Sequence, residues 1–239
     1  MDCIHVLDFD SEIFGFKVAK IVPDRLDKPN LQAALERLKD QQVRLAYWAS
    51  DSSDLVSQQA ASDYQGLLVD KKATYIIDFD QLAKSPMKLW QVQEYPQGDP
   101  DTALIKLAIE SGAYSRFKTD SHIPPEIFLE IYTRWISNST QRRIATHVFY
   151  IKHQGTTVGM VTLGEKHGRG DIGLLAVALE ARGKQLGLHL VCAAQAKFIE
   201  AGYRIGQVVT QLDNVAACKL YEKCGYHLEK LENFYHFWL

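Results

Sequence analysis

The stretch from Asp171 to Leu190, DIGLLAVALEARGKQLGLHL, constrains the fold of this chain more than any other. It opens with the apolar run Ile172–Leu179, which is typical of a buried strand. A short polar turn follows at Glu180–Lys184 and contains one glycine. Apolar residues at three-to-four spacing then predict a helix. We therefore interpret the segment as a strand, a basic turn and the N-terminus of a helix.

The expected chemistry of this turn is anion binding. The first N–H groups of a helix have no partner within the helix, and the helix dipole places partial positive charge at the same end. Both features favour phosphate binding. Arg182 and Lys184 add positive charge to the turn. The alternative is a plain strand-to-helix connection that binds no ligand.

The composition is that of a globular protein and argues against several functions. The chain has 239 residues, enough for one large domain or two small ones. Its net charge is -2 and it has no block of lysine or arginine, so no nucleic-acid partner is expected. No apolar stretch approaches the roughly 20 residues that span a membrane. The N-terminus carries early acids and no basic segment of a secretion signal, so we expect a cytoplasmic protein.

The four cysteines do not have the spacing of a zinc site, because no C-x-x-C pair occurs. Cys218 and Cys224 flank a predicted helix that His227 follows, which is a weak metal pattern. Buried free thiols are the better interpretation. We therefore expect no metal and a reducing compartment.

The first 80 or so residues predict a small α/β unit. The patterns predict strands at Ile13–Val22 and Val43–Ala49, and helices at Lys28–Gln42 and from about Asp54 to Tyr64. Gly66 is expected to end the second helix. The runs 67–69 and 74–79 are then expected to pair as a hairpin around Lys71-Lys72.

From Met87 to Leu239 the predicted order of elements is β-α-α-β-β-β-α-β-α-β-β. The first strand is expected at Met87–Tyr95, and an irregular loop at Tyr114–Pro125 is expected to separate two helices. The other predicted elements are helices at 101–112 and 126–138, a helix from Asn214 to Gly225, and strands at 147–153, 158–164, 205–210, 226–228 and 233–238.

This order and two motifs resemble the GNAT superfamily of acyl-CoA-dependent N-acyltransferases. In that family the turn has the form Arg/Gln-x-x-Gly-x-Gly/Ala; here Arg182 and Gly187 fit, and Gln185 stands where the first glycine is usual. The more specific motif is the run from Asn214 to Tyr226, NVAACKLYEKCGY. The resemblance implies an α/β fold with a mixed central sheet and flanking helices, preceded by a smaller α/β domain. We therefore expect an N-terminal domain at residues 1–84 and a GNAT domain at residues 85–239.

The resemblance also implies roles for individual residues, with acetyl-CoA as the co-substrate. Tyr221 would donate a proton to the CoA sulfur, although a core aromatic is the alternative, and Asn214 would both cap a helix and contact CoA. The backbone of Leu175, Ala176 and Val177 would bind the pantetheine arm. The pyrophosphate would be held by Arg182, Gly183, Lys184, Gln185, Leu186, Gly187 and Leu188.

The acceptor is expected to be a nucleotide-linked amino sugar. The loop Ser111–Asp120 and the N-terminal Phe-Gly-Phe at residues 14–16 resemble family members that acetylate dTDP-4-amino-4,6-dideoxygalactose in bacterial surface-glycan synthesis. Arg116 is the candidate for the phosphate, with Tyr114 and Phe117 stacking on a base or sugar; a plain surface arginine is the alternative. No general base is obvious, because Glu165, His167 and Asp171 are interpreted as solvated turn residues.

Two other functions stay open at this point. One is the acetylation of another small amine or of a peptide, and the other is a catalytically inactive scaffold that binds acyl-CoA. Tyr221 and the largely kept turn favour an enzyme. The acyl length and the oligomeric state are left open, with a homodimer among the alternatives.

The N-terminal unit also resembles the end of the chain. Residues 43–79 and 205–238 share the order strand, capped helix, strand and strand. Aligning Gly66 with Gly225 places Ser62 opposite Tyr221. We therefore predict a degenerate half-repeat without a catalytic tyrosine, and convergent use of helix-glycine-strand is the alternative.

Overall fold

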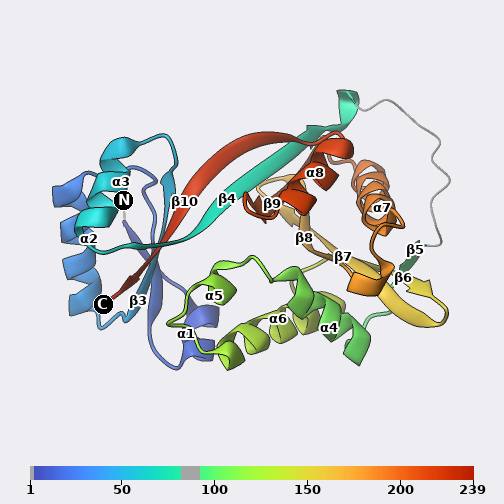
Figure 1. The fold of residues 1–239 in the computed structure, drawn as a ribbon, viewed down its shortest axis with the longest axis horizontal. Helices are drawn as coiled ribbons and strands as arrows, with labels where there is room; N and C mark the ends of the chain where they lie inside the picture. The colour runs from blue at the N-terminus through green and yellow to red at the C-terminus, as the bar shows by residue number, and fades with distance from the viewer. Residues whose placement is uncertain (1–2, 82–91) are drawn as a thin grey trace.

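The described residues, 3–81 and 92–239, form a mixed ten-stranded sheet in a computed structural model (Figure 1). The strand order is β1-β2-β3-β10-β4-β9-β8-β7-β6-β5. The strands are β1 (Ile4–Val6), β2 (Val18–Ile21), β3 (Leu45–Asp51), β4 (Leu67–Asp78), β5 (Val92–Glu94), β6 (His147–His153), β7 (Thr156–Lys166), β8 (Arg169–Val177), β9 (Ile205–Gln211) and β10 (His227–Trp238).

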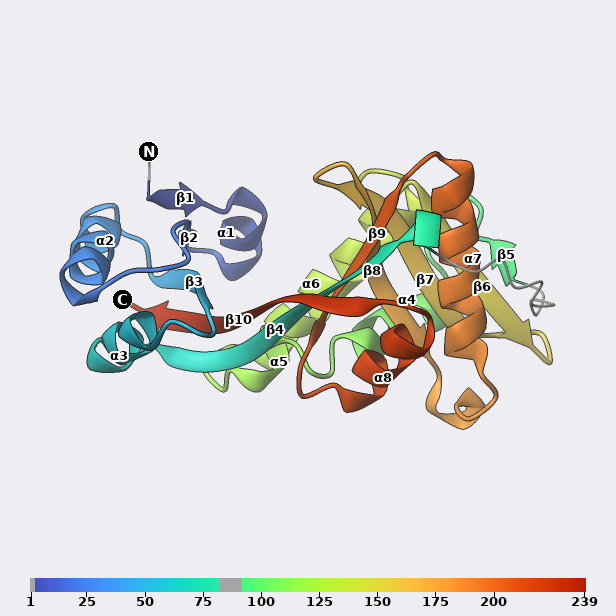
Figure 2. The same ribbon diagram turned by 90° about the horizontal axis from the view of Figure 1, so that it is seen from above.

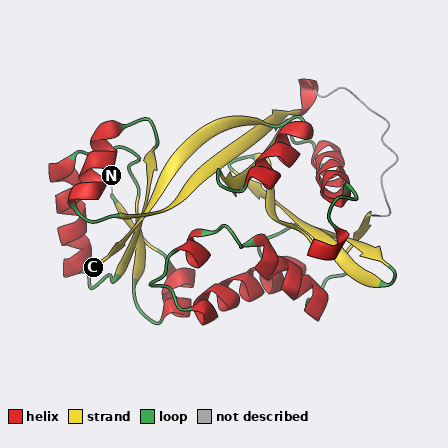
Figure 3. Cartoon of the chain, viewed as in Figure 1, coloured by secondary structure: helices red, strands yellow, loops and turns green. Residues whose placement is uncertain are grey.

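Helices cover both faces of this sheet (Figure 3). They are α1 (Asp8–Phe14), α2 (Lys28–Asp40), α3 (Leu55–Asp63), α4 (Thr102–Ser111), α5 (Arg116–Thr119), α6 (Pro125–Thr140), α7 (Leu186–Glu200) and α8 (Val215–Lys223). Two 3-10 turns, η1 (Phe79–Gln81) and η2 (Leu179–Ala181), follow strands β4 and β8. Among the described residues, no helix combines the length and the hydropathy needed to cross a bilayer.

Alternate residues of β3 show how the two faces are used. Ala46 and Trp48 belong to a core with residues of α2 and α3, whereas Leu45 and Tyr47 belong to a core with residues of α1, α5 and α6. This alternation follows from the two-residue period of a strand. A third core joins strands β4 to β9 with α7, α8 and α4.

The long strands β4 and β10 lie side by side across the middle of the molecule (Figures 1 and 2). Strand β4 also pairs with β9, and β10 also pairs with β3. The sheet therefore continues across the predicted boundary at residues 84 and 85, and the N-terminal segment supplies a central strand next to β9. The division into two domains stays a prediction.

The two ends of the chain are arranged with an approximate two-fold axis. The units β3-α3-β4 and β9-α8-β10 have elements of equal length, 7, 9 and 12 residues. Each element starts 160 residues after its counterpart, as with Leu67 and His227. At the centre Lys72 pairs with Glu232, and the register shifts lie symmetrically on either side. The degenerate half-repeat stays a prediction, and this symmetry defines which residues would be equivalent in the two units.

The offset corrects the predicted alignment of the two units by one residue. Gly225 falls opposite Gln65 instead of Gly66, and both positions have positive φ angles, 89° and 57°. Tyr221 falls opposite Ala61 instead of Ser62. The alignment on glycines was wrong because the left-handed position after α3 is occupied by glutamine. The position equivalent to Tyr221 still has no tyrosine, because it is occupied by Ala61.

Four of the predictions about elements are wrong. Residues 13–22 are not one strand, because α1 ends at Phe14 and Gly15 leaves the helix with a left-handed φ of 70°. The hairpin around Lys71-Lys72 is one continuous strand, β4, and the two closing strands are likewise one strand, β10. The predicted irregular loop at 114–125 contains the short helix α5.

The other elements are confirmed to within a few residues, including strand β6 at His147–His153. Of the strand predicted at 87–95, β5 covers Val92–Glu94. Residues 87–91 lie outside the described residues.

Candidate active site

Strands β8 and β9 diverge toward their C-terminal ends. They pair in parallel only from Gly170 to Ile172 on β8 and from Gly206 to Val208 on β9. Strand β8 then continues to Val177 and β9 to Gln211. Within the described residues, the backbone groups along this edge of β8 have no strand partner. A gap with unpaired N–H and C=O groups can bind an extended, amide-bearing ligand by adding to the sheet.

A bulge in β8 turns the strand away from β9. Gly173 and Leu174 lie opposite the single residue Thr162 of β7. The Leu174 N–H donates to Thr162 Oγ1 at 2.8 Å. A Cβ on Gly173 would lie 2.7 Å from the same oxygen, so the position needs glycine. Such bulges bend the strand and change the direction of its free groups.

The turn between β8 and α7 has the backbone of an anion site. Gly183 and Gln185 have left-handed φ angles of 79° and 60°. Gln185 makes no side-chain cap, and among the described residues the N–H groups of residues 183–185 have no backbone acceptor. The first N–H groups of α7 are also free of helical partners. The predicted arrangement of turn and helix N-terminus is therefore present.

The left-handed backbone explains why glycine is usual at the position of Gln185. A non-glycine residue in this conformation costs about 1–2 kcal/mol. The second glycine, Gly187, has a different reason, since a Cβ there would lie 3.1 Å from Leu220 Cδ2 of α8. The close contact packs the N-terminus of α7 against the helix that carries Tyr221.

Arg182 connects the turn to the end of strand β8. Its Nε donates to the Val177 carbonyl at 3.1 Å. Lys184 Nζ lies 3.4 Å from His153 Nε2. Both cations of the turn are therefore placed beside the start of α7.

Replacing Arg182 with glutamate is expected to weaken acetyl-CoA binding about tenfold or more. The change removes a cation that is expected to donate hydrogen bonds to phosphate, and it adds negative charge at a helix N-terminus. Titration calorimetry would measure the change. Arg204→Glu is the control, since this exposed arginine follows the C-terminal end of α7 and pairs with Asp80. Equal affinities for the two variants would remove Arg182 from the site.

Tyr221 lies on α8, two turns after Asn214. The Asn214 side chain caps the helix by accepting from the Ala217 N–H at 3.2 Å. The Tyr221 ring is only 4% exposed and packs between Tyr75 and Tyr226, at centroid distances of 6.3 and 6.0 Å. Burial raises the pKa of Tyr221, and the neighbouring thiols of Cys224 and Cys218 act in the same direction. The phenol therefore keeps its proton at neutral pH.

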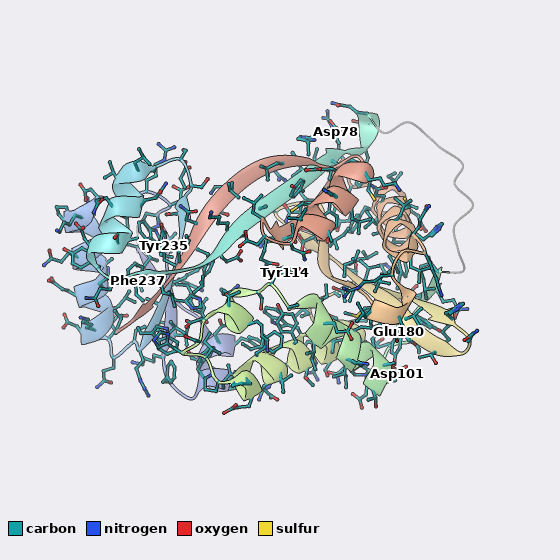
Figure 4. The ribbon with its side chains drawn as sticks, in the orientation of Figure 1. Asp78, Asp101, Tyr114, Glu180, Tyr235 and Phe237 are labelled. Carbon is teal, nitrogen blue, oxygen red and sulfur yellow. The ribbon has the colours of Figure 1, made fainter. Side chains whose placement is uncertain are left out.

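Apart from the gap between β8 and β9, a second candidate site is a cavity on the face of β4 that carries Lys72. Tyr75, which contacts Tyr221, is on the opposite face of β4. The cavity has a volume of about 570 Å³, and its lining includes Asp10, Tyr47, Lys72, Arg116, Glu232 and Phe234. The lining therefore combines α1, β3, α5 and the crossing of β4 and β10. Residues 111–120 contribute to it through Arg116, whereas Tyr114 lies on the preceding loop and is 47% exposed (Figure 4).

Arg116 is held in this cavity by aromatic rings. Its guanidinium carbon lies 4.1 Å from the ring centre of Phe117, 4.8 Å from that of Phe234 and 5.0 Å from that of Tyr47. Its buried Nε has no hydrogen-bond partner among the described residues. A fixed guanidinium with an unused donor fits an anionic ligand.

The expected stacking of Phe117 on a base or sugar is wrong. Phe117 is 2% exposed and packs in the core with Tyr47 and Trp135. One face of the ring supports Arg116 instead. The sequence pattern could not separate these roles, because an aromatic next to an arginine suits both.

The three acid–base candidates of the β7–β8 region lie away from the open end of the gap between β8 and β9. Asp171 accepts from Gln207 Nε2 at 2.8 Å, in the part of β8 that still pairs with β9, and burial raises its pKa. Glu165 accepts from the Tyr203 hydroxyl. His167 occupies the β7–β8 turn with a φ of 56°. None of the three is brought to the open end of the gap.

Within the described residues, no group of three or more metal-ligating side chains gathers at one place. Cys218 and Cys224 are buried free thiols. Several charged residues that line the cavity were missed from the sequence, namely Asp10, Lys72, Lys230 and Glu232. For Lys72 the signal was the charged stretch inside the run LLVDKKATYIID. The predicted hairpin placed this stretch in an exposed turn instead of in a strand.

The diverging strands, the open turn and the packed tyrosine helix define an acyl-CoA-type acetyltransferase fold. The model of the acetyltransferase (GNAT) family matches residues 104–226, just over half of the chain. The chain belongs to the acetyltransferase (GNAT) family, and the predicted fold class is confirmed.

Individual relatives are more distant. The chain is 29% identical over 143 residues to the spore coat polysaccharide biosynthesis protein SpsD of Bacillus subtilis (strain 168). The match covers 60% of this chain and 49% of SpsD, so it spans about half of that relative.

Two solved structures share the fold. A GCN5-related N-acetyltransferase from Sphaerobacter thermophilus has a TM-score of 0.65 and 14% identity, covering 98% of this chain and 75% of that chain. A tandem GNAT protein from the clavulanic acid biosynthesis pathway has a TM-score of 0.59 and 15% identity, covering 92% and 74%. At these identities the likeness concerns the fold alone.

Proposed function

We propose that this protein is an N-acetyltransferase that moves the acetyl group of acetyl-CoA to the amine of a nucleotide-linked amino sugar. The observation that carries the proposal is the gap between β8 and β9, which lies between the open turn at the start of α7 and the helix that bears Tyr221. The reaction needs a neutral amine, a stabilised oxyanion and a proton for the leaving thiolate.

The residues present fit acetyl-CoA, which supplies the thioester. The free edge of β8, at Leu175, Ala176 and Val177, suits the amides of the pantetheine arm. The N–H groups of residues 183–188, with Arg182 and Lys184, suit the pyrophosphate. Asn214 caps α8 and holds the start of the helix that carries Tyr221. Tyr221 keeps its proton until the thiolate needs it.

The second cavity is the proposed acceptor site. Its fixed Arg116 suits a diphosphate, and Lys72 adds a cation that is paired with Glu232 at 2.7 Å. The exposed ring of Tyr114 is the remaining candidate for stacking. A relative named for polysaccharide biosynthesis supports a sugar substrate. The specific acceptor that we propose is dTDP-4-amino-4,6-dideoxygalactose, in cytoplasmic synthesis of a surface glycan.

Replacing Arg116 with alanine is expected to raise the KM for this acceptor about tenfold or more and to leave the Kd for acetyl-CoA unchanged. Diphosphate binding is the same in the ground state and the transition state, so the loss falls on KM. Release of free CoA would measure turnover. Lys118→Ala is the matched control, because Lys118 is an exposed cation of the same short helix.

The decisive comparison is the dTDP-linked sugar against the free amino sugar. A much higher kcat/KM for the linked sugar would support the proposal. Equal kcat/KM values for the two sugars would mean that the enzyme does not recognise the nucleotide, and would favour another small amine as the acceptor. No turnover with any amine, together with binding of acetyl-CoA, would favour the inactive scaffold.

A further inference from the structure

Asp70 is a buried carboxylate on the strand that the N-terminal segment adds to the sheet. The residue is 9% exposed, and its Oδ1 has no hydrogen-bond partner among the described residues. A buried carboxylate oxygen without a partner is costly unless it serves a ligand or a proton. Asp70 therefore needs an explanation that the fold alone does not supply.

The position of Asp70 is at the open end of the β8–β9 gap. In β4, Lys72 pairs with Gln211, the last residue of β9. The Lys71 carbonyl then accepts from the Leu212 N–H at 2.8 Å. Asp70 follows directly, just beyond the last pair with β9. It is therefore next to the place where β8 and β9 lie apart.

Asp70 is also on the face of β4 that borders the proposed acceptor cavity. Residues 70 to 74 pair with β10 without a register shift, so Asp70 and Lys72 share one face of β4. Across the pair, Asp70 is opposite Phe234, and both Lys72 and Phe234 line the cavity. Tyr75, on the other face, contacts Tyr221. Asp70 is thus close both to lining residues of the proposed acceptor cavity and to the open end of the gap proposed for acetyl-CoA.

The charged and titratable groups that act on Asp70 come from α5, α6, β4, β9 and the β9–α8 connection. Burial raises the pKa of Asp70 to about 6, and Arg116, Gln211 and Lys72 act against this rise while Asp213 adds to it. Tyr132 of α6 is also within electrostatic range. A carboxylate with such a pKa can take a proton near neutral pH and return it to water.

We propose that Asp70 is the general base that takes the proton from the ammonium form of the acceptor, directly or through one water. The proposal rests on the proposed acetyltransferase function and names its missing residue. It also explains what the N-terminal segment contributes, since the residue equivalent to Asp70 by the 160-residue offset is Lys230 on β10. Only one of the two related positions carries a carboxylate.

The protons balance as follows. The ammonium gives one proton to Asp70, which later releases it to water. The neutral nitrogen forms the C–N bond to the acetyl carbon, and the C–S bond breaks. The thiolate takes a proton from Tyr221, and the second proton of the nitrogen restores the Tyr221 phenol. The products are the N-acetyl amine, CoA thiol and one released proton.

The test uses the full chain with acetyl-CoA and dTDP-4-amino-4,6-dideoxygalactose, and measures kcat/KM from about pH 5 to about pH 9. For the wild type we expect kcat/KM to rise with pH through about 6. In Asp70→Asn we expect kcat/KM to fall on the order of 10²-fold. The rise of kcat/KM through about pH 6, which is the acid limb of the pH profile, should be replaced by a rise that follows the titration of the amine itself. The Kd for acetyl-CoA should not change. Asp70→Glu should restore much of the wild-type kcat/KM and the acid limb of its pH profile.

Asp213→Asn is the matched control, because it removes a nearby exposed carboxylate on the β9–α8 connection. It should keep the rate and move the acid limb slightly to lower pH. Thermal melting would show that each variant is folded. A folded Asp70→Asn variant with the wild-type kcat/KM and acid limb would overturn the proposal. So would an Asp70→Glu variant as slow as Asp70→Asn.

A separate measurement distinguishes failure of Asp70 from failure of the acceptor. Carboxyl NMR of the wild type, compared with Asp70→Asn, gives the titration of Asp70 without turnover. If the wild type does not acetylate the dTDP-linked sugar, the proposed acceptor is wrong. The titration of the Asp70 carboxyl then decides whether Asp70 is kept as the proposed base. A carboxyl that titrates near 6 keeps Asp70 as the base, and one near the ordinary value of about 3.9 overturns it.

Discussion

Tyr221→Phe is expected to lower kcat by on the order of 10²-fold or more and to leave the Kd for acetyl-CoA nearly unchanged. The hydroxyl is needed only when the thiolate leaves, so its loss affects the transition state and not the bound ground state. The ring itself would stay packed between Tyr75 and Tyr226. Release of free CoA and titration calorimetry measure the two quantities.

Tyr226→Phe is the matched control for this experiment. Its ring packs against Tyr221, and its hydroxyl is buried without a partner among the described residues. Removing that hydroxyl should leave kcat unchanged and can slightly stabilise the fold. Wild-type turnover in Tyr221→Phe would show that Tyr221 is a packing residue.

The second large effect is expected on stability. Asp120→Ala should lower the free energy of unfolding by about 3 kcal/mol or more. Asp120 is 1% exposed and lies directly after α5. Its Oδ2 accepts from His236 Nδ1 at 2.7 Å and from Trp238 Nε1 at 3.0 Å, and its Oδ1 accepts from the His122 N–H at 2.9 Å. The variant leaves the fully buried His236 and the partly buried Trp238 without this acceptor. Urea unfolding would measure the loss.

The effect of Asp120 should depend on pH in a defined direction. Burial by itself raises the pKa of Asp120, but the hydrogen bonds from His236, His122 and Trp238 outweigh it and hold the pKa below its usual value. The stabilisation is therefore complete above the unfolded pKa of about 3.9 and is lost as pH falls through the folded value.

The difference between the wild type and Asp120→Ala should accordingly narrow in acid. Asp63→Ala is the control, because this exposed carboxylate pairs with Lys28 on the surface and should change stability little. A loss for Asp120→Ala no larger than that of the control would contradict the role of Asp120.

Elements with a strong local pattern could be predicted from the sequence. The helix α2 has Leu31, Leu35 and Leu38 on its buried face, as the three-to-four spacing indicated. The Asn214 cap and the turn before α7 were also correct, because capping and backbone N–H exposure depend on a few neighbouring residues.

Elements that are stabilised by distant partners could not be predicted from the sequence. Lys71-Lys72 looks like a turn, but Lys72 pairs with Glu232 from the other end of the chain, and this long-range pair keeps β4 continuous. For the same reason Asp70 was not recognised as a site residue. Its burial and its neighbours Arg116 and Gln211 exist only when β4 lies beside β9 and α5.

The sequence by itself determined the GNAT order of elements, the glycine-bearing turn before α7 and the helix that carries Tyr221. These depend on hydrophobic periodicity and on contacts within a few residues of one another. Only the tertiary structure decided that a strand of the N-terminal segment lies beside β9, that Phe117 is buried beneath Arg116, and that Asp70 is buried on the same face of β4 as Lys72. These arrangements depend on contacts between segments that are far apart in the sequence, and no local pattern specifies which strands will pair.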